Sequence, residues 1–327
     1  MGVMESLIRE KVPIKFMDLD LNSLMNFNYH EGFRLGAGLY TNHRVSRIFS
    51  GGGYFAYGFR DYTTKYGGRL DITFNRLHDV RLRTYFRNDV AAPGVSGFNR
   101  DSYSLFDSDL TPFFYNWMNN IEEYGADFEF PVLRYGRVTA FANQRTTSFT
   151  RNYQLYEFVG EAGVKRISAY ETTELGFNFR YSYAEEKAEL FNSALTTKTP
   201  NPVFDVGYTF GTGDFPESYR DEYHKVRARM RHTRLSQRLK KTSLFVEGAY
   251  VHGTVPLTEQ NTLRTVFEPS FWFYGRNAFQ TVRFREFFSD VAVQFFLHHE
   301  LAKSRSTNSI SKFNCSGNQC PSIYWYF

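Results

Sequence analysis

The residues of this chain best suited to chemistry are arginines that alternate with apolar residues. Ten of them occupy the polar positions of such segments: Arg34, Arg60, Arg69, Arg81, Arg83, Arg87, Arg180, Arg227, Arg229 and Arg231. Carboxylates occupy equivalent positions: Asp71, Asp127, Glu129, Glu157, Glu161 and Asp205. Arginines gathered on one face can pair with carboxylates to fill an interior, or can bind an anionic ligand such as a phosphorylated or carboxylated glycolipid. We favour the pairing and keep the arginine set as a ligand-binding hypothesis, densest at Arg227, Arg229 and Arg231.

Motifs for catalysis are missing from the sequence. It contains no G-x-S-x-G elbow, no H-E-x-x-H pair and no G-x-x-x-x-G-K-[ST] loop. His298 and His299 are adjacent, so in a strand their rings point to opposite faces and cannot bind one metal ion together. The sequence therefore predicts a protein without catalytic activity, cofactor or metal site.

The other titratable groups have simple structural interpretations. His224 and His232 share the parity of the apolar residues around them, which predicts interfacial positions near the two ends of one strand. We expect the adjacent acidic pairs at 122–123 and 185–186 at solvated strand ends. Cys315 and Cys320 lie in a Ser/Asn-rich stretch without nearby ligand partners, so we expect incidental thiols or one local disulfide.

Glu171–Glu186 shows most clearly the element that must position the arginines. Its odd positions are Leu175, Phe177, Phe179, Tyr181 and Tyr183, and its even positions are Gly176, Asn178, Arg180, Ser182 and Ala184. Successive side chains of a strand point to opposite faces, so this segment has one apolar face and one small or polar face. That pattern suits a strand with lipid on one side and a polar lumen on the other.

The same alternation recurs along the chain. We expect strands in the following segments: 13–20, 31–42, 51–61, 66–76, 80–89, 124–130, 138–143, 156–165, 171–186, 204–210, 222–234, 242–253 and 282–302. Residues 91–118 and 187–202 read as loops, the first with a short helical turn that begins near Asp101 or Ser102. Residues 254–281 show no regular pattern. Many segments reach the length with which a tilted strand crosses a bilayer, and they exceed the usual strand of a soluble protein.

Composition agrees with alternating faces. Aromatic residues make up 19% of the 327 residues, yet 22% are charged and the mean hydropathy is −0.46. No segment has the roughly 18–20 consecutive apolar residues of a membrane-spanning helix, so a membrane could be crossed only by a closed sheet. A soluble all-β binding module with an aromatic core is the alternative. The net charge of +5 is modest and does not indicate a nucleic-acid partner.

The stretch Glu31–Gly68 carries a family resemblance. The segments EGFRLGAGLYTN, SRIFSGGGYFAYGFRD and KYGG, with NSL at 22–24 and REFFSD at 285–290, resemble an outer-membrane β-barrel family of Bacteroidota. That family has no established activity and usually follows a carboxypeptidase-regulatory-like domain. It is distantly similar to surface-antigen and assembly-factor barrels. The resemblance covers about Pro13 to Leu301, and none of its motifs is catalytic.

The resemblance implies an outer-membrane location, with the lipid bilayer and the barrel-assembly machinery as partners. Two features depart from it: the upstream domain is missing, and a Ser/Asn/Cys tail replaces the strands expected after Leu301. Met1–Lys11 is not a signal peptide, so we expect a longer precursor.

We therefore expect an all-β chain that forms an antiparallel transmembrane β-barrel of long strands, which could be incomplete at its C-terminal side. Its expected parts are a lead-in at residues 1–12, the barrel at 13–303 and an atypical polar tail at 304–327. Its expected role is transport, assembly or surface anchoring.

Overall fold

The structure is a computed structural model. It describes residues 11–42, 44–46, 48–75, 80–94, 115–150, 155–158, 164–184, 186–190, 193–198, 201–216, 219–235, 241–267, 277–300 and 323–326. Among these residues, no helix combines the length and the apolar character needed to span a membrane.

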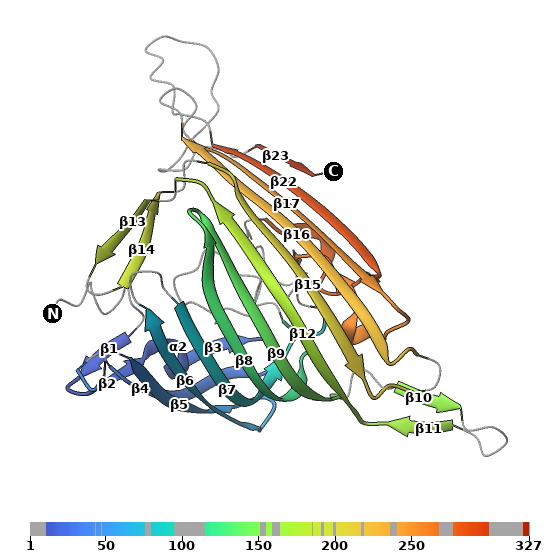
Figure 1. Ribbon diagram of the computed structural model, residues 1–327. Coiled ribbons are helices and arrows are strands. Elements are labelled where there is room, and N and C mark those ends of the chain that lie inside the picture. The colour runs from blue at the N-terminus through green and yellow to red at the C-terminus, as the bar shows by residue number, and fades with distance from the viewer. Residues whose placement is uncertain are drawn as a thin grey trace, which may run out of the picture.

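One large antiparallel sheet dominates the fold, and its long strands lie side by side in a curved layer (Figure 1). Its order is β1-β2-β4-β5-β6-β7-β8-β9-β12-β15-β16-β17-β22-β23, and β3 also pairs with β4. The bounds of the early strands are β1 Lys11–Ile14, β2 Met17–Asp20, β3 Met25–Asn28, β4 Gly32–Thr41, β5 Phe49–Gly58, β6 Thr64–Asn75 and β7 Val80–Ala91. The later strands are β8 Asn119–Leu133, β9 Gly136–Ser148, β12 Ala169–Ser182, β15 Val203–Gly213, β16 Glu222–Leu235, β17 Lys241–His252, β22 Val291–Glu300 and β23 Ile323–Tyr326.

Smaller elements lie in the connections. The helical turn α2 (Leu21–Leu24) joins β2 to β3, and the 3₁₀ turn η4 (Leu257–Glu259) follows β17. Two hairpins, β10–β11 (Leu155–Phe158 and Val164–Ile167) and β13–β14 (Glu186–Leu190 and Ser193–Lys198), lie apart from the large sheet at opposite ends of it (Figure 1). Two further pairs of short strands are present. β18 (Asn261–Thr262) pairs with β21 (Phe288–Ser289), and β19 (Thr265–Phe267) pairs with β20 (Phe279–Arg283).

The all-β antiparallel prediction is confirmed, but the sheet does not close. Among the described residues β1 and β23 are the two edges, and no hydrogen-bonded ladder joins them. The end of the predicted polar tail nevertheless belongs to the sheet, because β23 pairs antiparallel with β22 from Phe296↔Tyr326 to His299↔Ile323.

Four segment predictions were wrong in detail. The described part of the predicted strand 282–302 is divided among the end of β20, the short strand β21 and β22. Residues 13–20 form the hairpin β1–β2 instead of one strand. Residues 156–165 form the hairpin β10–β11 beside the large sheet, in a segment that contains two glycines, Gly160 and Gly163, between the strands. The predicted loop 187–202 contains the hairpin β13–β14. The predicted helical turn near residue 101 lies outside the described residues.

The two faces of the sheet differ as the alternation predicts. We call the outer face the one that carries Phe55, Leu175, Phe177 and Val226, all of which are exposed. The inner face carries the polar residues of opposite parity, many of which are buried. In the first part of β12, from Tyr170 to Phe177, exposure alternates from one residue to the next, with Glu174 buried and Leu175 and Phe177 exposed.

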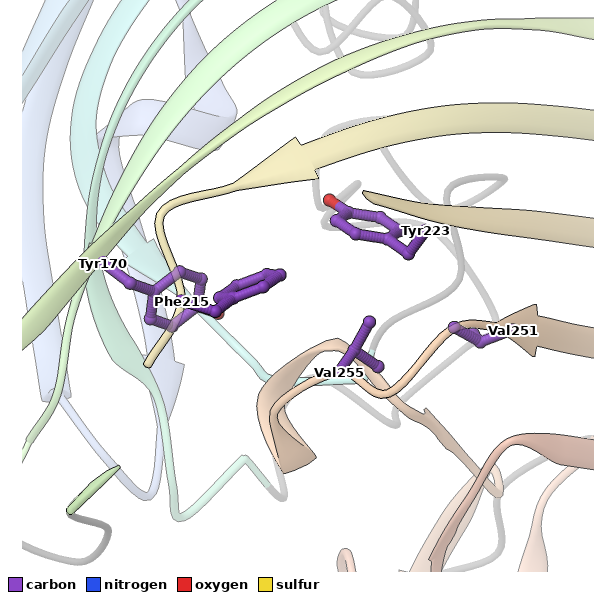
Figure 2. Close-up of a cluster of buried hydrophobic side chains, with 5 residues drawn as sticks. All are labelled: Tyr170, Phe215, Tyr223, Val251 and Val255. Atoms are coloured by element: carbon purple, nitrogen blue, oxygen red, sulfur yellow. The ribbon is translucent and has the colours of Figure 1, made fainter. Parts of the chain in front are cut away.

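The connections at one end of the sheet fold over the inner face. Residues 253–290, between β17 and β22, are called the inner connection here. Val255 of this connection packs in a buried cluster with Tyr170, Phe215, Tyr223 and Val251, which come from β12, the β15–β16 connection, β16 and β17 (Figure 2). We call this end the connection end. At the opposite end, a short turn joins β8 to β9.

Glycines let inner-face rings lie flat on the sheet. A Cβ atom added at Gly211 would come within 2.3 Å of the Tyr223 ring, and one added at Gly125 would come within 2.4 Å of the Tyr85 ring. In each pair the glycine and the tyrosine face each other on neighbouring strands. The tyrosine ring fills the space where a side chain at the glycine position would lie. Gly248 differs, because nothing lies within 4 Å of a Cβ added there.

Candidate functional site: charged clusters on the inner face

The most deeply buried charges lie at the connection end. Lys225 of β16 places its Nζ 2.9 Å from Glu174 Oε1 of β12 and 2.7 Å from Glu259 Oε2 of η4. Arg145 of β9 places a guanidinium nitrogen 2.7 Å from Glu259 Oε1. We call Arg145, Glu174, Lys225 and Glu259 the Lys225 cluster. It holds two cations and two carboxylates, so its formal charges cancel.

Two tyrosine hydroxyls complete the Lys225 cluster. Tyr170 donates to Glu259 Oε1 at 2.6 Å and also contacts the Thr258 hydroxyl at 2.9 Å. Tyr223 donates to Glu174 Oε1 at 3.0 Å. Both rings belong to the apolar cluster in Figure 2, so apolar packing and charge pairing meet at the same two side chains. A buried charge needs such partners because its desolvation is costly.

Electrostatics keep Glu259 ionised. Burial by itself raises the pKa of this carboxyl, but the positive charges of Arg145 and Lys225 outweigh burial and lower the pKa below its ordinary value. The inner connection is therefore held against the sheet by a carboxylate that stays charged. Three further bonds join the connection to neighbouring elements: Gly94 N donates to Thr258 O, Val251 N donates to Asp290 O, and Arg264 N donates to Gln294 Oε1.

A second buried cluster joins the N-terminal strands. Lys65 of β6 pairs with Asp61 and, at 2.9 Å, with Glu31 Oε1, and both the lysine and the glutamate are almost fully buried. Arg34 of β4 makes a two-nitrogen contact with Asp89 of β7 at 2.7 and 2.9 Å. These ion pairs connect β4, β6 and β7 across the inner face.

The predicted arginines mostly lie on the inner face in ion pairs with carboxylates of neighbouring strands. The pairs are Arg34 with Asp89, Arg69 and Arg83 with Asp71, Arg81 with Glu129, Arg87 with Glu123, and Arg180, Arg229 and Arg231 with Asp205. Arg227 lies in register between Gly207 and Ala249, in the same strand as Arg229. Arg60 differs from the prediction. β5 ends at Gly58, and Arg60 lies exposed in the following turn, where it donates to Tyr29 O at 2.8 Å.

Asp205 gathers three of the predicted arginines. Its Oδ2 lies 3.2 Å from Arg229 Nε and 3.1 Å from Arg231, and Oδ1 lies 4.0 Å from Arg180. The side chains of Arg180 and Arg231 remain 38% and 41% exposed. These two side chains leave the group around Asp205 accessible to a solute on the inner face.

The structure describes five of the six predicted carboxylates. Asp71, Glu129 and Asp205 pair with arginines. Asp127 lies opposite Arg83 in the β7–β8 register. Glu157 belongs to the β10–β11 hairpin, and Glu161 lies outside the described residues.

The Lys225 cluster was missed by sequence reasoning. Glu174 and Lys225 had a signal, since both occupy the polar parity of long alternating segments. Glu259 had none, because its segment shows no regular pattern and its partners come from three distant strands.

The histidines lie where parity predicts. His298 is buried on the inner face, whereas His299 Nδ1 contacts the Thr242 hydroxyl at 2.8 Å. His224 lies on the outer face, where its Nδ1 is 2.7 Å from the Tyr208 hydroxyl. Among the described residues, no three His, Cys, Asp or Glu side chains come together in a way that could hold a metal ion.

The chain matches no protein-family model and no curated protein sequence.

Proposed function

We propose that this chain forms most of an outer-membrane β-barrel whose lumen is filled by its own inner connection, and that it acts in anchoring or assembly without catalysis. The observation that carries this proposal is the inverted distribution of side chains. Leu175 and Val293 are 61% and 70% exposed on the outer face, whereas Lys65 and Glu123 are 0% and 1% exposed within the fold. A lipid environment outside the sheet explains both halves of this distribution.

Strand length supports the same proposal. β8, β9, β12 and β16 have 15, 13, 14 and 14 residues. A tilted strand needs about 9–11 residues to cross a bilayer, and soluble strands average about 5–6 residues. Closure of the barrel further requires that the edges at β1 and β23 be paired in the membrane, because lipid cannot satisfy free backbone groups.

The soluble alternative requires a cover for the outer face. A soluble all-β module buries its aromatic face, and soluble monomers rarely expose a continuous apolar patch beyond a few hundred square ångströms. The exposed outer residues extend over most of the sheet, from Phe33 and Phe55 to Phe128, Phe177 and Val293. The inner face, which would have to be the soluble core, instead holds the Lys225 cluster and the pairs around Asp71, Asp89 and Asp205.

Ion pairing favours a filled lumen over an open conduit. The inner connection closes over the Lys225 cluster, and most predicted arginines contact carboxylates on neighbouring strands. An anion-binding role for Arg180, Arg229 and Arg231 around Asp205 is the second candidate, because two of these side chains stay more than a third exposed.

Two experiments test the proposal. The complete precursor should remain in the membrane fraction after a carbonate wash and should leave it only in detergent; release by carbonate alone would contradict the membrane location. In planar bilayers the filled barrel should show no stable conductance. An anion-selective conductance that falls when Arg227, Arg229 and Arg231 are changed to Ala would instead support the conduit.

A further inference from the structure

A row of three rings crosses the outer face near the connection end. Phe210 of β15 pairs in register with His224 of β16, and His224 pairs with His252 of β17. The ring centroids are 5.3 Å apart for Phe210 and His224, and 6.2 Å apart for His224 and His252. Two imidazoles therefore lie close enough to contact one small polar group.

Each imidazole is held by a tyrosine hydroxyl. Tyr208 Oη lies 2.7 Å from His224 Nδ1, and Tyr250 Oη lies 3.3 Å from His252 Nδ1. When the hydroxyl donates to Nδ1, the proton of a neutral imidazole resides on Nε2. Among the described residues no further hydrogen bond engages either ring, so each Nε2–H is available to an acceptor outside the described residues.

The depth of this row follows from the residues on either side of it. Along β16 the outer-face sequence is Glu222, His224 and Val226, with Glu222 and Val226 both exposed. An exposed glutamate belongs in water, and an exposed valine of a membrane strand belongs in hydrocarbon. His224 thus lies at the boundary, where lipid headgroups are found. Arg220 and Asp221, which precede β16, are also exposed, as charged residues on the water side should be.

We propose that His224 and His252 bind the phosphate of a lipid headgroup, each donating from Nε2. A phosphate oxygen is a strong acceptor, and a hydrogen bond to an ionised acceptor is stronger than one between neutral groups. The apolar neighbours Val226 and Tyr250 would contact the first part of the acyl chains. This site rests on the proposed function, because without a bilayer around the sheet no headgroup is present.

The test compares lipid selectivity in vesicles of phosphatidylcholine that contain a small fraction of spin-labelled phosphatidic acid. The association constant of the labelled lipid, relative to labelled phosphatidylcholine, should fall about threefold to tenfold when His224→Ala and His252→Ala are combined, as two lost hydrogen bonds predict. The matched control is His232→Ala, at the other end of the same strand and on the same face, where Nδ1 has no hydrogen-bond partner. The control should leave selectivity unchanged.

A second variant separates ring contact from hydrogen bonding. Tyr208→Phe keeps the aromatic ring and removes the hydroxyl that holds His224, so selectivity for phosphatidic acid should fall while insertion stays normal. If the inserted wild type shows no preference for phosphatidic acid, or if the double histidine variant keeps that preference, the headgroup site is wrong and the barrel proposal stands. If the wild type does not enter vesicles at all, the barrel proposal itself fails.

Discussion

Lys225 Nζ lies 2.7 Å from Glu259 Oε2, although the lysine belongs to the sheet and the glutamate to the connection that covers it. Both side chains are almost completely buried. This contact links β16 to η4. Arg145 of β9 forms a second ion pair with η4, through the other carboxylate oxygen of Glu259. The inner connection is therefore part of the folded interior, and its removal would leave two cations without their shared counter-ion.

Loss of Glu259 should destabilise the protein strongly. Glu259→Ala leaves Arg145 and Lys225 buried without this carboxylate, and removal of one partner from a buried ion pair typically costs about 3–5 kcal/mol. Urea unfolding in detergent or vesicles measures the loss. Glu286→Ala is the control, since Glu286 lies exposed in the same connection and should change the free energy of unfolding little. Equal effects of the two changes would contradict the proposed role of the Lys225 cluster.

Acid should weaken the attachment of the inner connection to the sheet through Glu259. The folded pKa of Glu259 lies below its ordinary value of 4.5, so the unfolded chain takes up this proton first as the pH falls. The stabilisation from Glu259 is complete above about pH 4.5 and is lost as the pH falls through the lower folded pKa. Unfolding free energies measured across this range should decline more steeply for the wild type than for Glu259→Gln. Parallel pH profiles would show that Glu259 does not carry this dependence.

Glycines under inner-face rings should not tolerate a methyl group. Gly211→Ala forces a Cβ into the Tyr223 ring and should cost about 1–3 kcal/mol, as overpacking does. Gly248→Ala meets nothing within 4 Å and should leave stability unchanged or slightly raised. Urea midpoints of the two variants provide the comparison. A stable Gly211→Ala protein would mean that the Tyr223 ring does not occupy this place.

A charge on the outer face should cost more at mid-strand than at a strand end. Phe177→Arg puts a guanidinium on the apolar face near the middle of β12 and should cost about 2–4 kcal/mol in a bilayer, whereas Tyr183→Arg, just beyond the end of β12, should cost no more than about 1 kcal/mol. Refolding into vesicles gives both values. The two changes would have similar small effects if water, and not lipid, surrounded this face.

Alternation along the chain was sufficient to predict the sheet, because each long strand carries its own pattern. Leu175 and Glu174 take the faces that their parity indicates, and so do His298 and His299. Hairpins were harder to predict. Residues 156–165 alternate like a spanning strand, and the only sequence signal that they hold two paired strands is Gly160 and Gly163.

The candidate site was only partly predictable. Parity placed most of the arginines on the inner face, but it could not pair Arg34 with Asp89, which lies 55 residues away along the chain. Glu259 could not be found at all, because a carboxylate in an irregular connection acquires its role only when Arg145 and Lys225 are brought to it by the register of the sheet.

Two adjacent residues of β12 provide the most direct test of whether lipid covers the outer face of the sheet. Phe177 points outward and Asn178 inward on β12, so Phe177→Cys and Asn178→Cys can be compared after Cys315→Ser and Cys320→Ser remove the native thiols. Each protein carries a small thiol-linked fluorophore and is refolded into vesicles whose lipids have brominated acyl chains. If lipid covers the outer face, quenching should be strong at position 177 and weak at position 178. Equal quenching at both positions, or none at position 177, would show that lipid does not cover this face.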